Sequence, residues 1–399
     1  MDRPPVRRAP LPGSVSRPVA SPIHPSVVWA SDTPDGLDAQ YEGRSKGWTY
    51  SREGHPNAAA LAAHLDAMEG VDPATGGGIV TGSGMAAVTA AMMALLHRGD
   101  HVLGGDQLYG RSLRMMAEEL PRLGFETSLA DPTDGVAFAR AVRPNTRLIL
   151  VEVVSNPTLR VADMEAIARA AGASGALLVV DNTFTTPAAF RPFDHGADVV
   201  IHSVTKLLAG HSDAMLGYLA ARDPEVARRL MVTAVTLGLT PSPFDCWLAE
   251  RGLLTFDLRF RAACEGAARL ADALAAMPGV RRVVYPGRAD HPDRARAEAL
   301  LASPGNMVSF EVEGGRAGAN ALTAAVPRLA FAPTLGDVST TISHPASSSH
   351  RALSPEGRAA LGISEGFFRV SVGVEPAEAL IEEMARGVEA AQAAAARAA

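Results

Sequence analysis

The central part of the chain alternates short apolar runs with longer segments in which apolar side chains recur every three or four residues. The apolar runs lie at residues 101–105, 147–154, 176–182 and 197–203. They are continuous rather than alternating, which is typical of strands covered on both faces in a parallel sheet between layers of helices. We therefore predict an α/β domain with a mainly parallel sheet.

The segments between these runs show helical spacing. Residues 58–70 are the clearest example, with Leu61, Leu65 and Met68 on one face and Gly70 as a stop signal. The other predicted helices lie at residues 85–99, 112–124 and 161–173. Strands and helices thus follow one another in the order expected of a doubly wound fold.

The pattern changes near residues 237–243, where glycine and proline interrupt it. A long helical stretch over 245–277 follows, and then strand-like runs at 306–314 and 367–375 precede a terminal helix. These segments indicate a second, smaller domain of the α+β class.

The beginning of the chain is rich in proline and shows no sustained period. We expect an extended arm that packs on something else. The predicted organisation is an N-terminal arm over 1–52, an α/β domain over 53–243 and an α+β domain over 244–399.

Composition narrows the class of protein. The chain has 37 basic and 43 acidic residues and a net charge of −6, which argues against nucleic acid or a polybasic membrane anchor as partners. No apolar run approaches the roughly 18 residues that span a bilayer. Cys246 and Cys264 cannot form a disulfide framework and fit no metal spacing. We expect a cytoplasmic protein that binds no metal.

Several polar residues follow the predicted strands, and ligands of α/β sheets bind at such carboxyl ends. Ser155 and Asn156 follow one strand, Asp181 follows the next, and "HSVTK" brings Lys206 to the end of a third. Upstream, "TGSGMAA" has Gly84 at a strand-to-helix turn, where free amides favour an anion.

An amine, an acid and an anion cradle on neighbouring strand ends suggest pyridoxal phosphate as the cofactor. Each part also has an ordinary interpretation. A lysine at a strand end is commonly a solvated charge, and "DN" after a strand is common turn chemistry. The glycine turn is not a dinucleotide loop, because Ala87 stands where the third glycine would be. Their joint occurrence in this order favours the cofactor.

These residues resemble one family closely, the pyridoxal-phosphate enzymes grouped around cystathionine γ-synthase. The matching segments run from Tyr50 to Glu375 and include "YSREGHPN", "SGMAA", "DQLYG", "SNP", "VDNTF", "HSVTKLLAGHSD", "SPFDCWLAERGL", "TLGD" and "FFRVSVGVE". The resemblance implies the aminotransferase-like fold known as fold type I.

The resemblance implies a role for each matching residue on the cofactor side. Lys206 would form the Schiff base and carry protons between substrate carbons, and Asp181 would pair with the pyridine nitrogen. Tyr109 would stack on the ring and assist the leaving group, and Thr183 would pack nearby. The phosphate would be held by the backbone amides of Gly84 and Met85 and the hydroxyls of Ser203 and Thr205.

The same resemblance implies the substrate side. Arg369 would clamp the substrate α-carboxylate, with Asn156, Thr334 and Arg114 nearby.

It also implies contributions from a second subunit. Tyr50 and Arg52 would complete the phosphate site of the neighbouring subunit. Such sharing makes a dimer the catalytic unit, and members of the family usually pair dimers into a homotetramer. We expect His202 and His211 to be structural.

Some positions depart from patterns tied to particular substrates. Cystathionine-directed lyases tend to have acids at two positions that are Thr49 and Pro333 here. Methionine γ-lyases have a cysteine where this chain has Arg111, and the usual "NPT" is "HPN" with His55. Two cations near the leaving-group side, without a distal acid, favour a substrate with an anionic or neutral distal group, although the leaving group itself is not fixed by these residues.

We predict a carbon–sulfur lyase that acts by γ-elimination on cystathionine, methionine or homocysteine. Residues 340–358 also resemble homoserine-ester sulfhydrylases, so γ-replacement on O-acetyl- or O-succinyl-homoserine is the alternative. An inactive regulatory homologue and a nicotinamide oxidoreductase are remoter alternatives. The retained Lys206, Asp181, Tyr109 and Arg369 argue against the former, and Ala87 argues against the latter.

Overall fold

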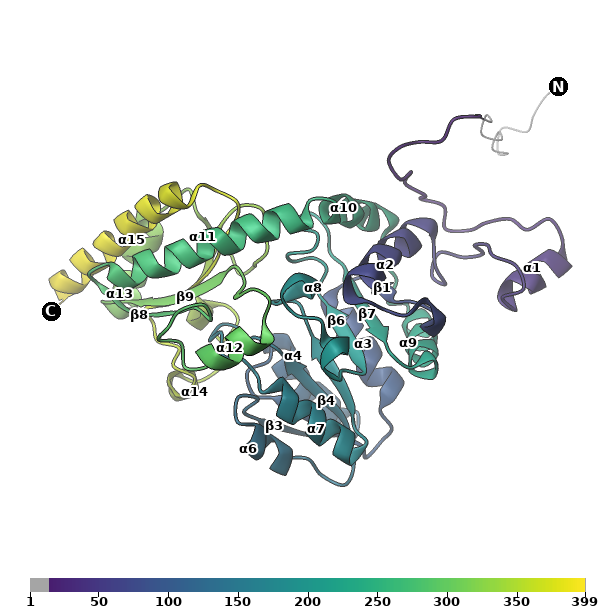
Figure 1. The fold of residues 1–399 in the computed structure, drawn as a ribbon, viewed down its shortest axis with the longest axis horizontal. Coiled ribbons are helices and arrows are strands. Elements are labelled where there is room, and N and C mark those ends of the chain that lie inside the picture. Colours follow the sequence, from purple (N-terminus) through teal and green to yellow (C-terminus); the bar gives the residue numbers. More distant parts are fainter. Residues whose placement is uncertain (1–13, 399) are drawn as a thin grey trace.

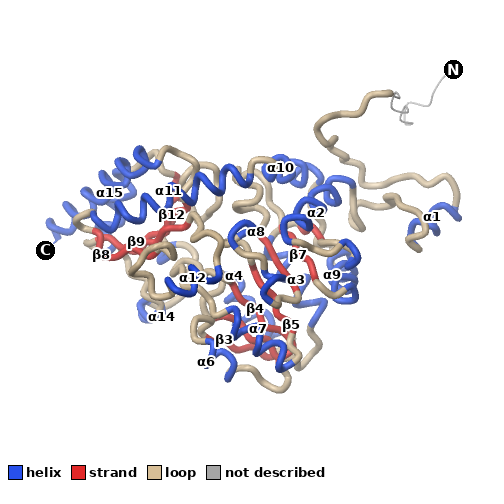
Figure 2. The backbone as a smooth tube through the Cα atoms, viewed as in Figure 1, coloured by secondary structure: helices blue, strands red, loops and turns tan. Residues whose placement is uncertain are grey.

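The structure, a computed structural model, describes residues 14–398. Two sheets lie side by side, each with its own helices, and the long helix α11 runs from one part to the other (Figure 1). Strands of the two sheets form separate groups in the tube view (Figure 2). The mixed α/β architecture with a large and a small sheet agrees with the predicted fold class.

The larger sheet has seven strands in the order β1-β7-β6-β5-β4-β2-β3. Strands β6, β5, β4, β2 and β3 are parallel, whereas β7 runs antiparallel to both of its neighbours. The strands are β1 (Ile79–Thr81), β2 (His101–Gly105), β3 (Glu126–Ala130), β4 (Thr146–Glu152), β5 (Leu177–Asp181), β6 (Val199–His202) and β7 (Gly217–Ala221). The mainly parallel sheet is confirmed.

Helices cover this sheet on both faces, as β4 illustrates. Its side chains alternate between two cores, with Ile149 and Val151 in one and Leu148 and Leu150 in the other. Each fully buried aliphatic side chain contributes about 1.5–3 kcal/mol. The surrounding helices are α2 (Pro56–Glu69), α3 (Gly84–Leu95), α4 (Gly110–Arg114), α5 (Leu120–Arg122), α6 (Gly135–Arg140), α7 (Met164–Ser174), α8 (Thr186–Ala189) and α9 (Pro224–Thr236), and a π-helical turn, Met115–Glu119, joins α4 to α5.

Helix α2 follows directly from its sequence. Its N-cap is His55, whose Nδ1 accepts a hydrogen bond from the Ala58 amide at 3.1 Å. Leu61 and Leu65 are fully buried, and Gly70 ends the helix with a φ of 70°. Glycine adopts this left-handed conformation at little cost. The predicted helix and its stop are confirmed.

The smaller sheet has five strands in the order β10-β11-β12-β9-β8 around a separate core. Its strands are β8 (Val280–Val284), β9 (Met307–Val312), β10 (Ala330–Phe331), β11 (Thr341–Ser343) and β12 (Phe367–Ser371). Its helices are α12 (Arg294–Leu300), α13 (Gly315–Ala325), α14 (Pro355–Ala360) and α15 (Ala377–Ala398). The helical stretch predicted over 245–277 is two helices, α10 (Pro243–Leu253) and α11 (Phe256–Ala276).

The N-terminal segment extends away from both sheets (Figure 1). From residue 14 onwards this segment contains a helix, α1 (Pro34–Tyr41), which its proline content and lack of period did not predict. Thr33 caps this helix by accepting a hydrogen bond from the Gly36 amide at 3.1 Å. Residues 1–13 of the predicted arm lie outside the described residues, and the domain boundaries at 53 and 244 stay predictions. Between residues 14 and 398, no helix combines the length and the apolar character needed to cross a bilayer.

Candidate active site

Lys206 lies in the turn that follows β6, against a loop of the smaller sheet. Its Nζ donates a hydrogen bond to Thr334 Oγ1 at 3.4 Å. Gly336 packs directly on this turn, because a Cβ added there would lie 2.4 Å from the Leu207 nitrogen. Burial and the nearby Arg369 charge lower the pKa of Lys206. Lys206 is therefore not an ordinary solvated lysine.

Asp181 ends β5 beside this turn. Its Oδ1 accepts hydrogen bonds from the amide and the hydroxyl of Thr183, at 3.1 and 2.6 Å. The same hydroxyl oxygen accepts from the Ser203 amide at 2.8 Å, which ties the ends of β5 and β6 together. Burial raises the pKa of Asp181, while the Thr183 hydrogen bonds and the neighbouring His202 lower it.

The N-terminus of α3 is the turn at which the sequence predicts an anion cradle. Ser83 caps the helix through the Ala86 amide at 3.1 Å, so the amides of Gly84 and Met85 have no partner within the helix. A Cβ on Gly84 would lie 2.7 Å from the Ser203 Cβ. Glycine thus allows the helix start and Ser203 to approach one another.

Thr205 is oriented differently from what its predicted role requires. Its hydroxyl donates to the Leu216 carbonyl at 3.1 Å and accepts from the Leu216 amide at 2.9 Å. Phosphate binding by Thr205 stays a prediction, since a ligand would compete with these backbone contacts.

Arg369 lies on β12 and joins the two parts of the chain. One guanidinium nitrogen donates to Asn156 Oδ1 at 2.7 Å, and another donates to the Thr334 carbonyl at 2.7 Å. The Nε atom is buried and has no partner among the described residues. Burial lowers the pKa of Arg369. The side chain is thus held in place with one donor still available for a ligand.

Two residues that the sequence did not point to support this site. Glu152 lies opposite Asp181 in the sheet, and its carboxylate accepts a hydrogen bond from the Tyr109 amide. Burial and the Asp181 charge raise the pKa of Glu152 well above its ordinary value. Glu152 therefore positions Tyr109. The sequence signal that could have identified Glu152 is an acidic residue at the end of an apolar run.

Arg259 of α11 is the second. Its guanidinium donates to the carbonyls of Leu207, Leu208 and Gly252 at 3.0, 3.1 and 2.9 Å. These bonds fix the turn immediately after Lys206 to the long helix. Helical periodicity places Arg259 on a helix, but it does not reveal that the side chain bonds to a turn of another part of the chain.

Three predicted residues do not join this cluster. Tyr50 is exposed, and the Arg52 guanidinium lies 5.5 Å from the centre of its ring. Arg52 also donates to the carbonyl of Val235 on α9 at 3.4 Å. Arg114 forms an exposed ion pair with Glu118 at 3.0 Å. The hydrogen bonds of the described residues thus do not connect Tyr50, Arg52 or Arg114 to Lys206.

Other candidate groups have structural contacts. His55 caps α2, and the Nδ1 of His211 contacts the Ala209 carbonyl at 2.7 Å. Burial raises the pKa of both Cys246 and Cys264, so neither thiol is activated. Within residues 14–398, no three His, Cys, Asp or Glu side chains are grouped as a metal site.

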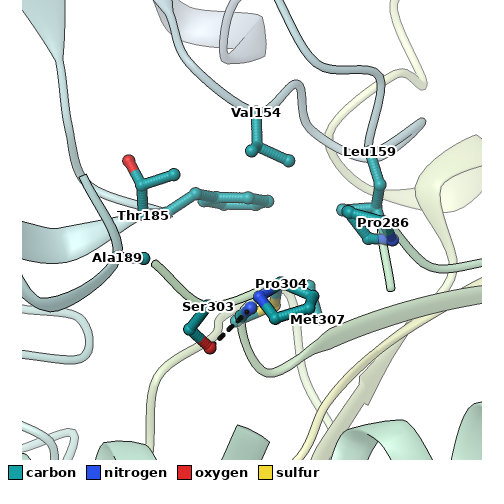
Figure 3. Close-up of a pocket in the computed structure, with 10 residues that line it drawn as sticks. Val154, Leu159, Thr185, Ala189, Pro286, Ser303, Pro304 and Met307 are labelled. Atoms are coloured by element: carbon teal, nitrogen blue, oxygen red, sulfur yellow. Dashed lines mark hydrogen bonds between the residues drawn. The ribbon is translucent and has the colours of Figure 1, made fainter. Parts of the chain in front are cut away.

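A small pocket lies between the two parts of the chain, close to the cluster (Figure 3). The larger-sheet part contributes Val154, Leu159, Thr185 and Ala189, and the other part contributes Pro286, Ser303, Pro304, Gly305 and Met307. Phe184 also lines it and lies 5.8 Å, centroid to guanidinium, from Arg369. None of the ten lining residues is a predicted cofactor or substrate residue, so this pocket is not the candidate active site.

Comparisons with known proteins agree on one family. A family model described as "Cys/Met metabolism PLP-dependent enzyme" matches residues 9–389. The chain is 41% identical over 333 residues to a cystathionine β-lyase of Bacillus subtilis, covering 84% of each. It is 39% identical over 350 residues to an O-succinylhomoserine sulfhydrylase of Pseudomonas aeruginosa, covering 88% of this chain and 86% of that one.

A solved structure extends the similarity to the fold. The crystal structure of a cystathionine γ-synthase from Xanthomonas oryzae, in complex with cystathionine, matches with a TM-score of 0.88 and 39% identity. The match covers 94% of both chains. The similarity therefore includes both sheets and the residues between them.

Proposed function

The chain belongs to the pyridoxal-phosphate-dependent enzymes of cysteine and methionine metabolism, and on that premise we propose a carbon–sulfur lyase that acts by γ-elimination. The substrate is a sulfur amino acid of the cystathionine, methionine or homocysteine type. The products are a 2-oxo acid, ammonia and a thiol. The observation that carries this proposal is the half-buried Lys206 amine, 3.4 Å from Thr334, whose carbonyl accepts a hydrogen bond from Arg369.

The residues at the strand ends fit pyridoxal 5′-phosphate. The free amides of Gly84 and Met85 and the Ser203 hydroxyl suit a phosphate, and no Cβ would fit at Gly84 without displacing Ser203. Asp181 suits the pyridine nitrogen, and Lys206 suits the aldehyde carbon. When bound, the cofactor supplies an electron sink for negative charge at the substrate α-carbon.

Arg369 binds and orients the substrate in this proposal. Its buried Nε lacks a partner in the described part of the chain, and a carboxylate would satisfy it. Asn156 and Thr334 already fix the plane of the guanidinium. The substrate carboxylate therefore meets an arginine that needs little further ordering.

Lys206 moves the protons. Because burial and Arg369 lower its pKa, the neutral amine is more available near pH 7 than that of a solvated lysine. Its Nζ would take the proton from the α-carbon, pass that proton on and so become neutral again, and then take one from the β-carbon. The Tyr109 hydroxyl gives a proton to the leaving sulfur, and Glu152 fixes the backbone that carries this tyrosine.

A replacement reaction is the second candidate. The relative from Pseudomonas aeruginosa is named an O-succinylhomoserine sulfhydrylase, and residues 340–358 resemble that group. In this alternative, a thiol adds at the γ-carbon of O-acetyl- or O-succinyl-homoserine. The residues that bind the cofactor and the carboxylate keep the same roles.

The quaternary structure and location form part of the proposal. Tyr50 and Arg52 are exposed, and no hydrogen bond between described residues joins them to Lys206, which supports their use by a neighbouring subunit. We propose a homotetramer of two dimers with shared active sites, in the cytoplasm. Light scattering of the purified protein measures the assembly.

A substrate panel tests the reaction. Purified protein is incubated with cystathionine, methionine, homocysteine, cysteine and the two O-acyl-homoserines, each with and without added thiol. Formation of 2-oxobutyrate from a sulfur amino acid without thiol is the expected result. Product only with thiol would show replacement instead, and no turnover of any substrate by cofactor-loaded protein would indicate an inactive homologue.

A further inference from the structure

The loop that carries Asn156 is closed at its base. It covers residues 155–160, between β4 and α7. The Ser155 amide donates to the Arg160 carbonyl at 2.9 Å, and the Arg160 amide donates to the Ser155 hydroxyl at 2.9 Å. Asn156 lies next to this base, and its Oδ1 accepts a hydrogen bond from Arg369 at 2.7 Å. The position of Asn156 relative to Arg369 therefore depends on where the base of the loop is held.

Strand β9 of the smaller sheet contacts the loop beside Asn156. The Ser309 hydroxyl donates to the Pro157 carbonyl at 2.7 Å, and both residues are buried. Ser309 lies opposite Arg369 in the pairing of β9 with β12. Two neighbouring residues of the loop thus contact the same place on the smaller sheet, whereas the other end of the loop is held elsewhere.

Asp293, just before α12, holds that other end. Its Oδ2 accepts from Arg160 Nε at 2.6 Å and from the Val161 amide at 3.0 Å, and its Oδ1 accepts from a second guanidinium nitrogen of Arg160 at 2.9 Å. The Asp293 side chain is 7% exposed and that of Arg160 is 33% exposed. A bidentate pair of this kind fixes the direction of both side chains as well as their separation. Asp293 is thus joined to two consecutive residues at the point where the loop ends.

His291 holds Asp293 in turn. The Asp293 amide donates to His291 Nδ1 at 3.1 Å, and His291 Nε2 lies 3.0 Å from the Leu159 carbonyl. A backbone amide only donates and a carbonyl only accepts, so both bonds form when the ring proton is on Nε2. The buried His291 therefore connects Asp293 to a residue within the loop.

We propose that Asp293 is a positioning residue for substrate binding, which acts through Arg160 and is supported by His291. It fixes the base of the loop, so Asn156 stays where its amide oxygen orients the Arg369 guanidinium for the substrate carboxylate. A binding group that is already oriented needs less ordering when the substrate binds. The inference rests on the proposed function of Arg369 as the group that binds this carboxylate.

The ordinary interpretation of the Arg160–Asp293 pair is that it only stabilises the contact between the two parts of the chain. No hydrogen bond between described residues joins the pair to Asp181, Ser203 or Lys206. A general loosening would weaken the binding of every ligand. A positioning role would weaken only the binding of ligands that have a carboxylate.

The test compares L-alanine with ethylamine, which is the same amine without the carboxylate. Neither has a leaving group, so titration of the cofactor-loaded, full-length protein, followed by cofactor absorbance, gives both dissociation constants. Asp293→Asn and Arg160→Met are expected to weaken the binding of L-alanine about ten-fold and that of ethylamine less than about two-fold, since misplacing a group by about 1 Å can cost as much as about 10²-fold. An equal loss for both ligands, or no loss for either, would overturn the proposal.

Two further variants separate the possible outcomes. Arg282→Met removes a partly buried ion pair with Glu311 inside the smaller sheet, 2.9 Å long, and is expected to change neither dissociation constant. Arg369→Lys is expected to weaken the binding of L-alanine alone. If it does not, the proposed function of Arg369 fails. If it does, and Asp293→Asn and Arg160→Met have no effect, this inference alone is wrong.

A double variant tests whether the pair acts as a unit. Asp293→Asn combined with Arg160→Met should lose no more affinity for L-alanine than either change alone, because residues in contact are not additive, and additive losses would contradict the proposal. Thermal melting identifies a variant that does not fold. Arg160→Met should fold, since Arg296 lies 3.7 Å from Asp293 and leaves that carboxylate a nearby cation. If it does not fold, Arg160→Lys replaces it, because lysine keeps the charge without the bidentate bonds, and an unchanged affinity for L-alanine would then refute the proposal.

Discussion

The cofactor half of the candidate site and its substrate half are assembled in different ways. Asp181, Thr183, Ser203 and Lys206 lie within 26 residues of sequence, on two adjacent strand ends of one sheet. Arg369, by contrast, reaches Asn156 across 213 residues and comes from the other sheet. The first half depends on local strand geometry, whereas the second exists only when the two parts of the chain pack together.

Because of this difference, mutations should affect cofactor binding and substrate binding separately. Changes in the cofactor half should alter cofactor binding and its spectrum. Changes in the substrate half should alter substrate affinity and leave the bound cofactor intact. Lys206 contacts both halves, since its amine bonds to Thr334.

Replacing Lys206 by alanine should have the largest effect. We expect kcat/KM to fall by at least about 10³-fold, because the proton-transferring amine is lost. The exposed Lys46, the only other lysine in the sequence, provides the matched control, and Lys46→Ala should retain full activity. Activity of Lys206→Ala near the level of the unaltered protein would contradict the proposed mechanism.

Arg369→Lys should separate the two halves. A lysine cannot reproduce the fork of bonds to Asn156, Thr334 and a carboxylate, so the loss of about 1.5–3 kcal/mol corresponds to a 10- to 150-fold lower kcat/KM. The dissociation constant of the cofactor, measured by equilibrium dialysis, should be the same as in the unaltered protein. Asp181→Asn should show the opposite pattern, with weaker cofactor binding. Equal effects of both variants on the cofactor would refute the division.

Arg114 offers a smaller test of the substrate half. Its exposed ion pair with Glu118 should contribute no more than about 1 kcal/mol to stability. If Arg114 binds substrate in the assembled enzyme, Arg114→Ala raises KM several-fold, whereas Glu118→Ala removes the same ion pair without this effect. Steady-state kinetics of the two variants provide the comparison. Equal KM values would exclude Arg114 from the substrate site.

Glu53 should have an effect confined to one substrate. Thr49 stands where cystathionine lyases tend to have an acid, and its hydroxyl donates to the Glu53 carboxylate at 3.5 Å. Glu53→Gln should raise KM for cystathionine by no more than about five-fold, the scale of an exposed charge contact. KM for methionine should not change, and Glu42→Gln on the same segment is the control. An equal change for both substrates would rule out recognition of the distal ammonium by Glu53.

The smallest expected effect is a change in the pH dependence of stability when Lys206 is replaced in the cofactor-free protein. The pKa of Lys206 is lowered in the folded state relative to its ordinary value of 10.5. Between the folded and the unfolded pKa the unfolded chain binds more protons, so stability rises with pH in that window. Lys206→Met should therefore melt higher than the unaltered protein near pH 7, and the difference should shrink towards about pH 10. A constant difference would contradict the lowered pKa.

Much of the larger sheet could be predicted because buried parallel strands are continuous apolar runs. The run at 101–105 coincides with β2, and the runs at 176–182 and 197–203 contain β5 and β6. The edge strand β3 was missed, since its residues are polar and partly exposed. The helical stretch predicted over 245–277 is divided at Leu254 and Thr255, neither of which is a proline or a glycine, so the break could not be located from the sequence.

The site was predictable where its residues are close in sequence. The strand-end order of Asp181 and Lys206 indicated the cofactor without knowledge of the packing. The Arg160–Asp293 contact spans 133 residues, and no local pattern around either residue gives a sign of such a partner. Arg259 escaped prediction for the same reason, because its acceptors are backbone carbonyls of a turn on another element. Contacts that arise only from packing leave no local pattern.

The covalent position of the cofactor tests the central claim most directly. The sequence contains two lysines, Lys46 and Lys206, so a chemical label can be assigned without ambiguity. The cofactor-loaded protein is reduced with borohydride, digested and analysed by mass spectrometry. The account predicts a phosphopyridoxyl group on Lys206 and an unmodified Lys46. A group on Lys46, or no modified peptide at all from cofactor-loaded protein, would contradict it.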